Sequence, residues 1–246
     1  MDGFDPAKSF GPEVAQRYDG RSLRGDEAET VEFLASHAGN GSALEFAIGT
    51  GRIAIPLSER GIHVDGIELS PDMVAQLRKK RGGEKVDVTV GDMARASAPR
   101  GDYGLVYLVF NTIYNILTQD DQVRCFENAA RHLAEEGVFV VEAAVPSAWI
   151  RGDQFINVEQ LTNDEVVLDA NRYDPVTQIL DENHVSLTKD GVRLFPISCR
   201  LIWPSEMDLM ARIAGLKLVD RWGDWSAQPF TASSSRHISI YARAAE

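Results

Sequence analysis

Short apolar runs alternate with amphipathic segments from residue 42 to residue 143. The apolar runs have the length of buried strands, and the segments between them repeat apolar residues at helical spacing. The predicted strands cover residues 42–48, 63–68, 86–90, 103–110 and 138–143. The predicted helices cover residues 26–38, 51–60, 71–81 and 120–133. Strict alternation predicts a doubly wound, mostly parallel α/β sheet with helices on both faces.

Local signals mark the ends of several elements. Ser70 is a good N-cap and Pro71 suits the first turn of the helix that follows. Gly61 suits the position just after the preceding helix. Residues 111–119 read as a polar loop, and Glu136-Gly137 as a turn before the strand at 138.

The pattern changes after residue 143. Residues 165–171, 177–188 and 192–203 read as strands, with turns at 174–175 and 190–191. The segment 155–203 is therefore predicted to be an inserted antiparallel meander of three or four strands. A helix at 204–214 and strands at 216–222 and 237–243 then complete a main sheet of seven strands.

Composition narrows the class of protein. A chain of 246 residues with 44% hydrophobic and 25% charged residues suits one globular α/β domain. The formal net charge of −12 disfavours a nucleic-acid partner, because phosphate backbones are bound mainly by Lys and Arg. No apolar run approaches the roughly 20 residues that span a bilayer, and the start lacks a signal-peptide pattern. We therefore expect a cytoplasmic protein without membrane contact.

The segment from Ala43 to Arg52 carries the most chemical information. It reads as a strand that leads into a turn containing Gly49 and Gly51 and then into a helix, and the next strand ends in Glu68. Glycines let the backbone approach a ligand closely and tolerate positive φ. An acid at the next strand tip can accept hydrogen bonds from two ribose hydroxyls. This unit predicts a site for an adenosine-type cofactor.

Further polar positions are expected near the same place. Asp92 follows the third predicted strand, and Asn111 follows the fourth. Because the carboxyl ends of parallel strands meet at one edge of a sheet, these two side chains and Glu68 should gather there.

These motifs resemble those of the class I S-adenosylmethionine-dependent methyltransferases that act on small molecules. The acid-and-glycine motif is Glu45-Phe46-Ala47-Ile48-Gly49-Thr50-Gly51, with Ala47 in place of a glycine, and a third signature is Gly91-Asp92-Met93. The resemblance implies a Rossmann-like, seven-stranded sheet with an antiparallel last strand. It also implies one domain over residues 1–246, with an N-terminal helical lid at about 1–41 and the meander as a β cap.

The resemblance assigns roles to individual residues. Glu68 should hold the ribose hydroxyls, Asp92 should accept from the adenine amino group, and Asn111 should lie near the sulfonium. Tyr114 and Tyr18 should lie near the substrate, and Tyr18 or His184 could supply chemistry. The cofactor-binding residues expected in this way are Glu45, Ala47, Gly49, Gly51, Glu68, Leu69, Met73, Asp92, Met93 and Asn111.

Other classes of protein share parts of this pattern. A nicotinamide-binding domain would tolerate Ala54 in place of its third glycine but does not require the motif after strand three. Asn111-Thr112-Ile113-Tyr114 lacks the prolines of amino-methylating DNA enzymes. A protein substrate would need an open groove, which the predicted cap disfavours. A non-catalytic sensor or partner subunit that keeps S-adenosylmethionine remains the alternative function.

The predicted function is metal-independent methyl transfer to an N or O atom of a small molecule. A sulfonium is already an activated methyl donor, so alignment of the acceptor and exclusion of water are the main requirements. The chain carries no clustered acidic motif for a metal. The acceptor atom, the substrate and a homodimeric assembly stay open.

Overall fold

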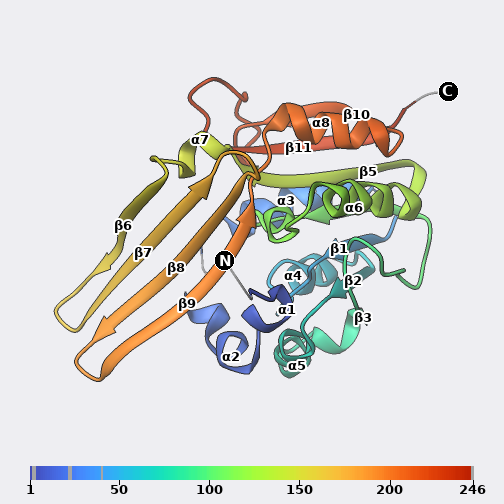
Figure 1. The fold of residues 1–246 in the computed structure, drawn as a ribbon. Coiled ribbons are helices and arrows are strands. Elements are labelled where there is room, and N and C mark those ends of the chain that lie inside the picture. Colours follow the sequence, from blue (N-terminus) through green and yellow to red (C-terminus); the bar gives the residue numbers. More distant parts are fainter. Residues whose placement is uncertain (2–3, 22–23, 40, 245–246) are drawn as a thin grey trace.

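The computed structural model describes residues 1, 4–21, 24–39 and 41–244. Residues 2–3, 22–23 and 40 of the predicted lid segment lie outside this description. The chain forms two sheets, a seven-stranded main sheet and a four-stranded second sheet (Figure 1). The strands of the main sheet are β1 (Ala43–Phe46), β2 (Val64–Glu68), β3 (Asp87–Val90), β4 (Tyr103–Leu108), β5 (Leu133–Ala144), β10 (Leu216–Trp222) and β11 (Arg236–Arg243).

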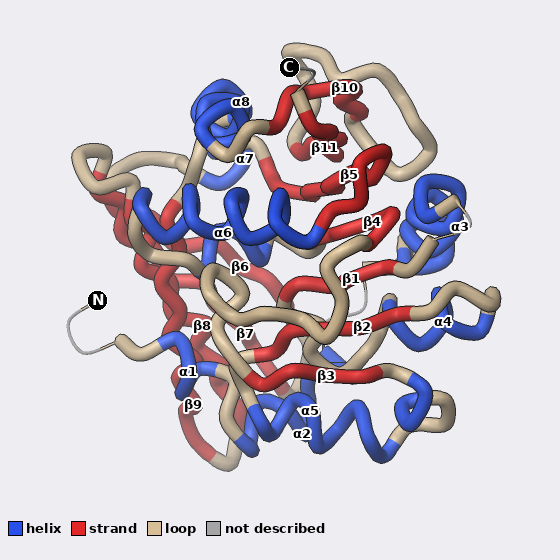
Figure 2. Tube along the Cα trace, turned by 90° about the vertical axis from the view of Figure 1, so that its right-hand side faces the viewer, coloured by secondary structure: helices blue, strands red, loops and turns tan. Residues whose placement is uncertain are grey.

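The strand order of the main sheet is β10-β11-β5-β4-β1-β2-β3 (Figure 2). Strands β1 to β5 pair in parallel, whereas β11 is antiparallel to both β5 and β10. The predicted doubly wound, mostly parallel sheet with an antiparallel last strand is thus confirmed. The carboxyl ends of the parallel strands lie along one edge, where α/β sheets bind ligands.

Helices cover both faces of the main sheet. Helices α6 and α8 pack over one face, and α3, α4 and α5 pack over the other. Side chains of β1 alternate between the two cores, because Leu44 and Phe46 join the first cluster and Ala43 joins the second. The helices are α3 (Glu27–Ala38), α4 (Ala54–Glu59), α5 (Pro71–Lys79), α6 (Gln119–His132) and α8 (Pro204–Ile213).

The ends of these helices follow the local sequence signals. Ser70 Oγ accepts a hydrogen bond from Met73 N, and Pro71 opens α5. Gly61 has φ +86°, a conformation that glycine adopts without strain just after a helix. The expected caps therefore form.

The predicted meander is an antiparallel sheet of four strands that projects from the main sheet (Figure 1). Every neighbouring pair is antiparallel, and the last strand ends at Arg200 rather than at 203. The strands are β6 (Gln154–Leu161), β7 (Glu165–Asp174), β8 (Ile179–Thr188) and β9 (Gly191–Arg200).

Several local predictions differ from the structure. Glu136-Gly137 does not form a turn before β5 but lies inside it, because β5 starts at Leu133. The pairing of β5 with β4 shifts its register between Leu133 and Val138. The polar loop after β4 contains a short 3₁₀ helix, η2 (Thr112–Asn115), and a second one, η1 (Gly83–Lys85), precedes β3. The short helices α1 (Pro6–Ser9) and α2 (Pro12–Arg21) lie within the N-terminal segment predicted to be helical, whereas α7 (Pro146–Trp149) was not predicted.

Gly66 in β2 marks a close approach between neighbouring segments. A Cβ built at Gly66 would lie 2.8 Å from Ile48 Cβ and 2.5 Å from Ile48 Cδ1. Gly66→Ala is expected to lower the free energy of unfolding by about 1–3 kcal/mol, because Ile48 must move within a packed core. Urea unfolding measures this change. Gly101→Ala is the control, since a Cβ there meets nothing within 4 Å; equal stability of the two variants would contradict the prediction.

Candidate active site

A large open cavity of about 1290 Å³ lies at the carboxyl edge of the main sheet. Its walls come from the turns after β1, β2, β3 and β4, from α1 and α2, and from one face of the second sheet. The N-terminal helices α1 and α2 lie between β9 of the second sheet and α5 (Figure 1). Because binding sites for single drug-sized ligands run to roughly 1,000 Å³, the cavity has room for more than one small ligand.

The glycine turn and Glu68 form one side of the cavity. Gly49 has φ +58°, and its N–H donates to Glu68 Oε2 at 2.8 Å. Ser70 N donates to Glu68 Oε1 at 2.8 Å. The carboxylate is thus fixed by two backbone donors, while burial raises its pKa. Each oxygen keeps further acceptor capacity, so Glu68 can also accept two hydroxyls, as a ribose would require.

Gly49 itself leaves space on the cavity side. A Cβ built there would meet only Met73 Cε at 3.4 Å and Ala47 O at 3.9 Å. Ala47, Gly49 and Met73 all line the cavity. The backbone of the turn is therefore open to a ligand at this point, in accordance with the cofactor expected from the sequence.

Asp92 and Met93 line the cavity after β3, and Leu69 lines it after β2. Asp92 Oδ1 accepts from Ala94 N at 2.8 Å, and Asp92 Oδ2 accepts from Arg95 at 2.7 Å. Leu69 is 42% exposed although it is apolar. The half-exposed Asp92 carboxylate can accept a hydrogen bond from the polar edge of a planar base. Leu69 and Met93 offer apolar surface to the faces of the base.

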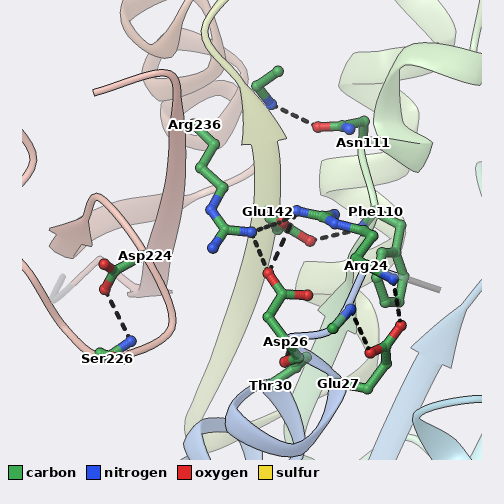
Figure 3. Close-up of polar contacts among 12 residues, drawn as sticks. Arg24, Asp26, Glu27, Thr30, Phe110, Asn111, Glu142, Asp224, Ser226 and Arg236 are labelled. Atoms are coloured by element: carbon green, nitrogen blue, oxygen red, sulfur yellow. Dashed lines mark hydrogen bonds and ion pairs between the residues drawn. The ribbon is translucent and has the colours of Figure 1, made fainter. Parts of the chain in front are cut away.

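Phe110 and Asn111 form a tight turn after β4, with φ +59° and +62°. Left-handed conformations at two successive non-glycine residues are strained and persist only when the surroundings hold them. Phe110 N donates to Glu142 Oε2 at 2.8 Å, and Ala144 N donates to Asn111 Oδ1 at 2.6 Å (Figure 3). Strand β5 therefore fixes the turn that brings Asn111 to the cavity.

Glu142 also joins this turn to distant parts of the chain. Its side chain is 1% exposed, and Glu142 Oε1 lies 2.5 Å from Arg24 and 3.4 Å from Arg236. Arg236 and Arg24 both reach Asp26 as well (Figure 3). One buried carboxylate thus connects the segment before α3, the start of β11 and the turn at the cavity.

The N-terminal helices are tied to the same turns. Asp19 accepts from Thr50 Oγ1 at 2.6 Å and pairs with Lys80 at 2.6 Å. Ser70 Oγ donates to Phe10 O at 2.6 Å. Tyr18 lines the cavity, and burial raises the pKa of its phenol, so it is neutral at physiological pH.

Three residues expected at the site do not line the cavity. Tyr114 is fully buried, and its hydroxyl donates to Ala144 O and Ile202 O. Gly51 shapes the turn instead: its φ is +75° and its N–H donates to Ile48 O at 3.0 Å. Glu45 lies inside the protein and accepts a hydrogen bond from Tyr107 at 2.9 Å.

The buried position of Glu45 has a consequence for stability. Burial raises the pKa of Glu45 from its ordinary value of 4.5 to about 8. A raised carboxyl pKa stabilises the folded state below the unfolded pKa, and this contribution is lost as pH rises from about 4.5 through about 8. Glu45→Gln is therefore expected to gain stability relative to the native chain at pH above about 8. Urea unfolding at several pH values measures this difference. Glu59→Gln, at an exposed position at the end of α4, is the control. The same dependence of stability on pH in the native chain and in Glu45→Gln would refute the prediction.

The second sheet supplies a polar wall that the sequence did not reveal, apart from His184. Side chains of β6, β7 and β8 face the cavity at alternate positions. His184 Nδ1 lies 3.0 Å from Glu159 Oε2 and 3.9 Å from Asp169 Oδ1. The hydrogen bond with Glu159 raises the pKa of His184. The period-two alternation was visible in the sequence, but the face that meets the cavity was not.

The described residues hold no group of three or more His, Cys, Asp and Glu side chains with the arrangement of a metal site. Within the same ranges, no helix is both long and apolar enough to cross a membrane.

Fold and cavity together define an α/β protein with a ligand-sized cavity at the carboxyl edge of its sheet. Residues 43–137 match the methyltransferase-domain family. The CcbJ methyltransferase from Streptomyces caelestis is 34% identical, with a TM-score of 0.91 over 98% of this chain and 100% of that one. The chain belongs to the class I S-adenosylmethionine-dependent methyltransferases and is an enzyme that uses S-adenosylmethionine.

Two curated relatives give further comparisons. A cypemycin N-terminal methyltransferase from Streptomyces sp is 26% identical over 229 residues, which is 90% of this chain and 92% of the relative. A dTDP-3-amino-3,6-dideoxy-alpha-D-glucopyranose N,N-dimethyltransferase from Streptomyces fradiae is 29% identical over 144 residues, 56% of this chain and 55% of the relative. The second relative is named as an N,N-dimethyltransferase, whereas the first is named for the N-terminal position that it methylates.

Proposed function

We propose that the chain methylates a nitrogen atom of a small molecule, without a metal ion. The observation that carries this proposal is that the Glu68 turn and the second sheet line the same cavity. The cofactor side and the acceptor side are therefore continuous. The name of the aminosugar N,N-dimethyltransferase supports both nitrogen as the acceptor and a small substrate.

The cofactor side of the cavity is proposed to follow the residues that the sequence singled out. Glu68 accepts the ribose hydroxyls, Asp92 with Met93 holds the adenine, and the turn at Gly49 faces the methionine part. Bound S-adenosylmethionine supplies a methyl group on a positively charged sulfur. Asn111, which β5 holds in place, lines the same cavity and is proposed to lie near the sulfonium.

The other elements are proposed to enclose the acceptor. Helices α1 and α2 act as a lid, because Asp19 and Phe10 tie them to the cofactor turns. The second sheet acts as the cap that carries the acceptor. Alignment of the acceptor and exclusion of water then supply much of the rate, up to roughly 7–11 kcal/mol in ideal cases.

Methyl-labelled S-adenosylmethionine tests this function. The purified protein is incubated with a panel of small amines and with alcohols of matching shape, in the presence and absence of EDTA. We expect label on amine nitrogen, at a rate that EDTA leaves unchanged. Transfer to alcohols alone, or loss of transfer in EDTA, would contradict the proposal. Cofactor binding without transfer to any compound would favour the non-catalytic alternative.

A further inference from the structure

The second sheet gathers polar side chains in two neighbouring rows that face the cavity. The register of β7 and β8 places Asp169 directly opposite His184 and Asn171 directly opposite Glu182. Residues two apart on a strand share a face, so all four side chains lie on one side of the sheet. All four also line the cavity.

Two of these side chains carry buried oxygen atoms without a hydrogen-bond donor. Asp169 and Asn171 are each 7% exposed. Asp169 Oδ2 accepts from Asn171 Nδ2 at 2.8 Å, but Asp169 Oδ1 and Asn171 Oδ1 receive no hydrogen bond from any described residue. Buried polar atoms normally have partners, so these oxygens indicate a donor that comes from a ligand.

The charges in this wall are also unbalanced. Among the cavity-lining residues of β6 to β9, only His184 can carry positive charge, and Glu159 holds it at 3.0 Å. His184 Nδ1 also lies 3.9 Å from Asp169 Oδ1, so this one cation is shared between Glu159 and Asp169, and Glu182 adds a further carboxylate to the wall. Burial, and then the negative charge of Asp169, raises the pKa of Glu182 to about 7. A bound cation would relieve the repulsion between these two groups.

Positive charge elsewhere in the cavity does not fill this role. Arg17 on α2 pairs with Glu13 at 3.3 Å, and Arg151 is an exposed residue between α7 and β6. Phe155 and Phe195 flank the polar rows, since Phe155 lies opposite Asn171 and Phe195 lies opposite His184. The wall thus offers acceptors for a cation and apolar surface for the rest of a ligand.

We propose that Asp169, Asn171 and Glu182 form a subsite that binds the protonated amine of the methyl acceptor, so that the substrate is an aliphatic amine with an apolar body. This inference rests on the proposed function. An ammonium group carries several donors and makes its strongest hydrogen bonds to carboxylates. The nitrogen can accept a methyl group only when its lone pair is free. One ammonium proton therefore passes to the Glu182 carboxylate before transfer, which leaves a neutral amine beside a carboxylic acid. A hydroxyl brings no positive charge and leaves the carboxylates uncompensated, so the subsite selects amines over alcohols.

Ligand-observed NMR tests the subsite with cyclohexylamine and cyclohexanol, which differ in charge but not in shape. The protein is first saturated with S-adenosylhomocysteine. We expect cyclohexylamine to bind at millimolar concentration, about tenfold or more tighter than cyclohexanol. Asp169→Asn and Glu182→Gln should each weaken amine binding by about tenfold or more and leave the affinity for S-adenosylhomocysteine unchanged.

Asp164→Asn is the matched control, because it removes a carboxylate from the exposed turn between β6 and β7 and does not line the cavity. It should leave both affinities unchanged. Equal binding of amine and alcohol, absence of amine binding to the saturated protein, or full amine affinity in Asp169→Asn would each overturn the subsite. A protein that binds no S-adenosylhomocysteine would refute the proposed function instead, on a separate readout.

Discussion

Glu68→Ala is expected to weaken the binding of S-adenosylmethionine by at least about 100-fold. Hydrogen bonds to a charged group contribute about 1.5–3 kcal/mol each, and the proposed role gives Glu68 two of them to ribose. The variant also removes the acceptor of Gly49 N and Ser70 N, so the turn that faces the cofactor loses its support. Isothermal titration calorimetry measures the affinity directly.

Two further variants sharpen this prediction. Glu68→Gln keeps the shape but turns an amide N–H toward one of the two backbone donors, so it should also lose affinity. Asp72→Asn removes a nearby carboxylate from the first turn of α5, outside the cavity lining. It should bind the cofactor as the native chain does. An unchanged affinity in Glu68→Ala would refute the ribose role.

Glu142→Ala is expected to lower the free energy of unfolding by about 3–5 kcal/mol. Removal of one partner from a buried ion pair leaves the opposite charge without compensation. Here two arginines, Arg24 and Arg236, lose the same carboxylate, and Phe110 N loses its acceptor. Chemical denaturation measures the change. Glu136→Ala on the exposed part of β5 is the control and should stay near the native value.

The same variant should also reduce activity in the fraction that remains folded. The Phe110-Asn111 turn has positive φ at both residues and is held by Glu142 and by Ala144 N. Without Glu142 the turn can relax, and Asn111 then leaves the place proposed for it beside the cofactor. Native stability together with full activity in Glu142→Ala would contradict the role given to this carboxylate.

The sequence predicted the main sheet well because its signals are local. Each buried strand is a short apolar run, and Ser70, Pro71 and Gly61 mark helix ends by their own backbone preferences. The right-handed crossovers then place helices on both faces of the sheet. By contrast, the strand that runs through Glu136 and Gly137 depends on pairing with β4, which no local pattern reports.

The site was less predictable because side-chain direction in turns is a tertiary property. Glu68 and Asp92 reach the cavity from strand ends, as the topology requires. Glu45 and Tyr114 are as close to the motifs in sequence, yet they point into the protein toward Tyr107 and Ala144. Spacing along the chain cannot distinguish these two outcomes.

The acceptor wall was hidden for a related reason. Asp169 and Glu182 alternate with neighbours that face away from the cavity, and both faces of the second sheet carry polar residues. Only the packing of that sheet beside the main one decides which face encloses the substrate. Glu142 gave no signal either, because its partners Arg24 and Arg236 lie far from it in the chain.

A crystal structure of the complex with S-adenosylhomocysteine tests the central claim most directly. The account predicts one ligand per chain in the cavity, with ribose hydroxyls hydrogen-bonded to Glu68 and the adenine beside Asp92 and Met93. The homocysteine sulfur should then face Asn111 and the second sheet. Density for the ligand elsewhere, or a ribose that does not contact Glu68, would contradict the account.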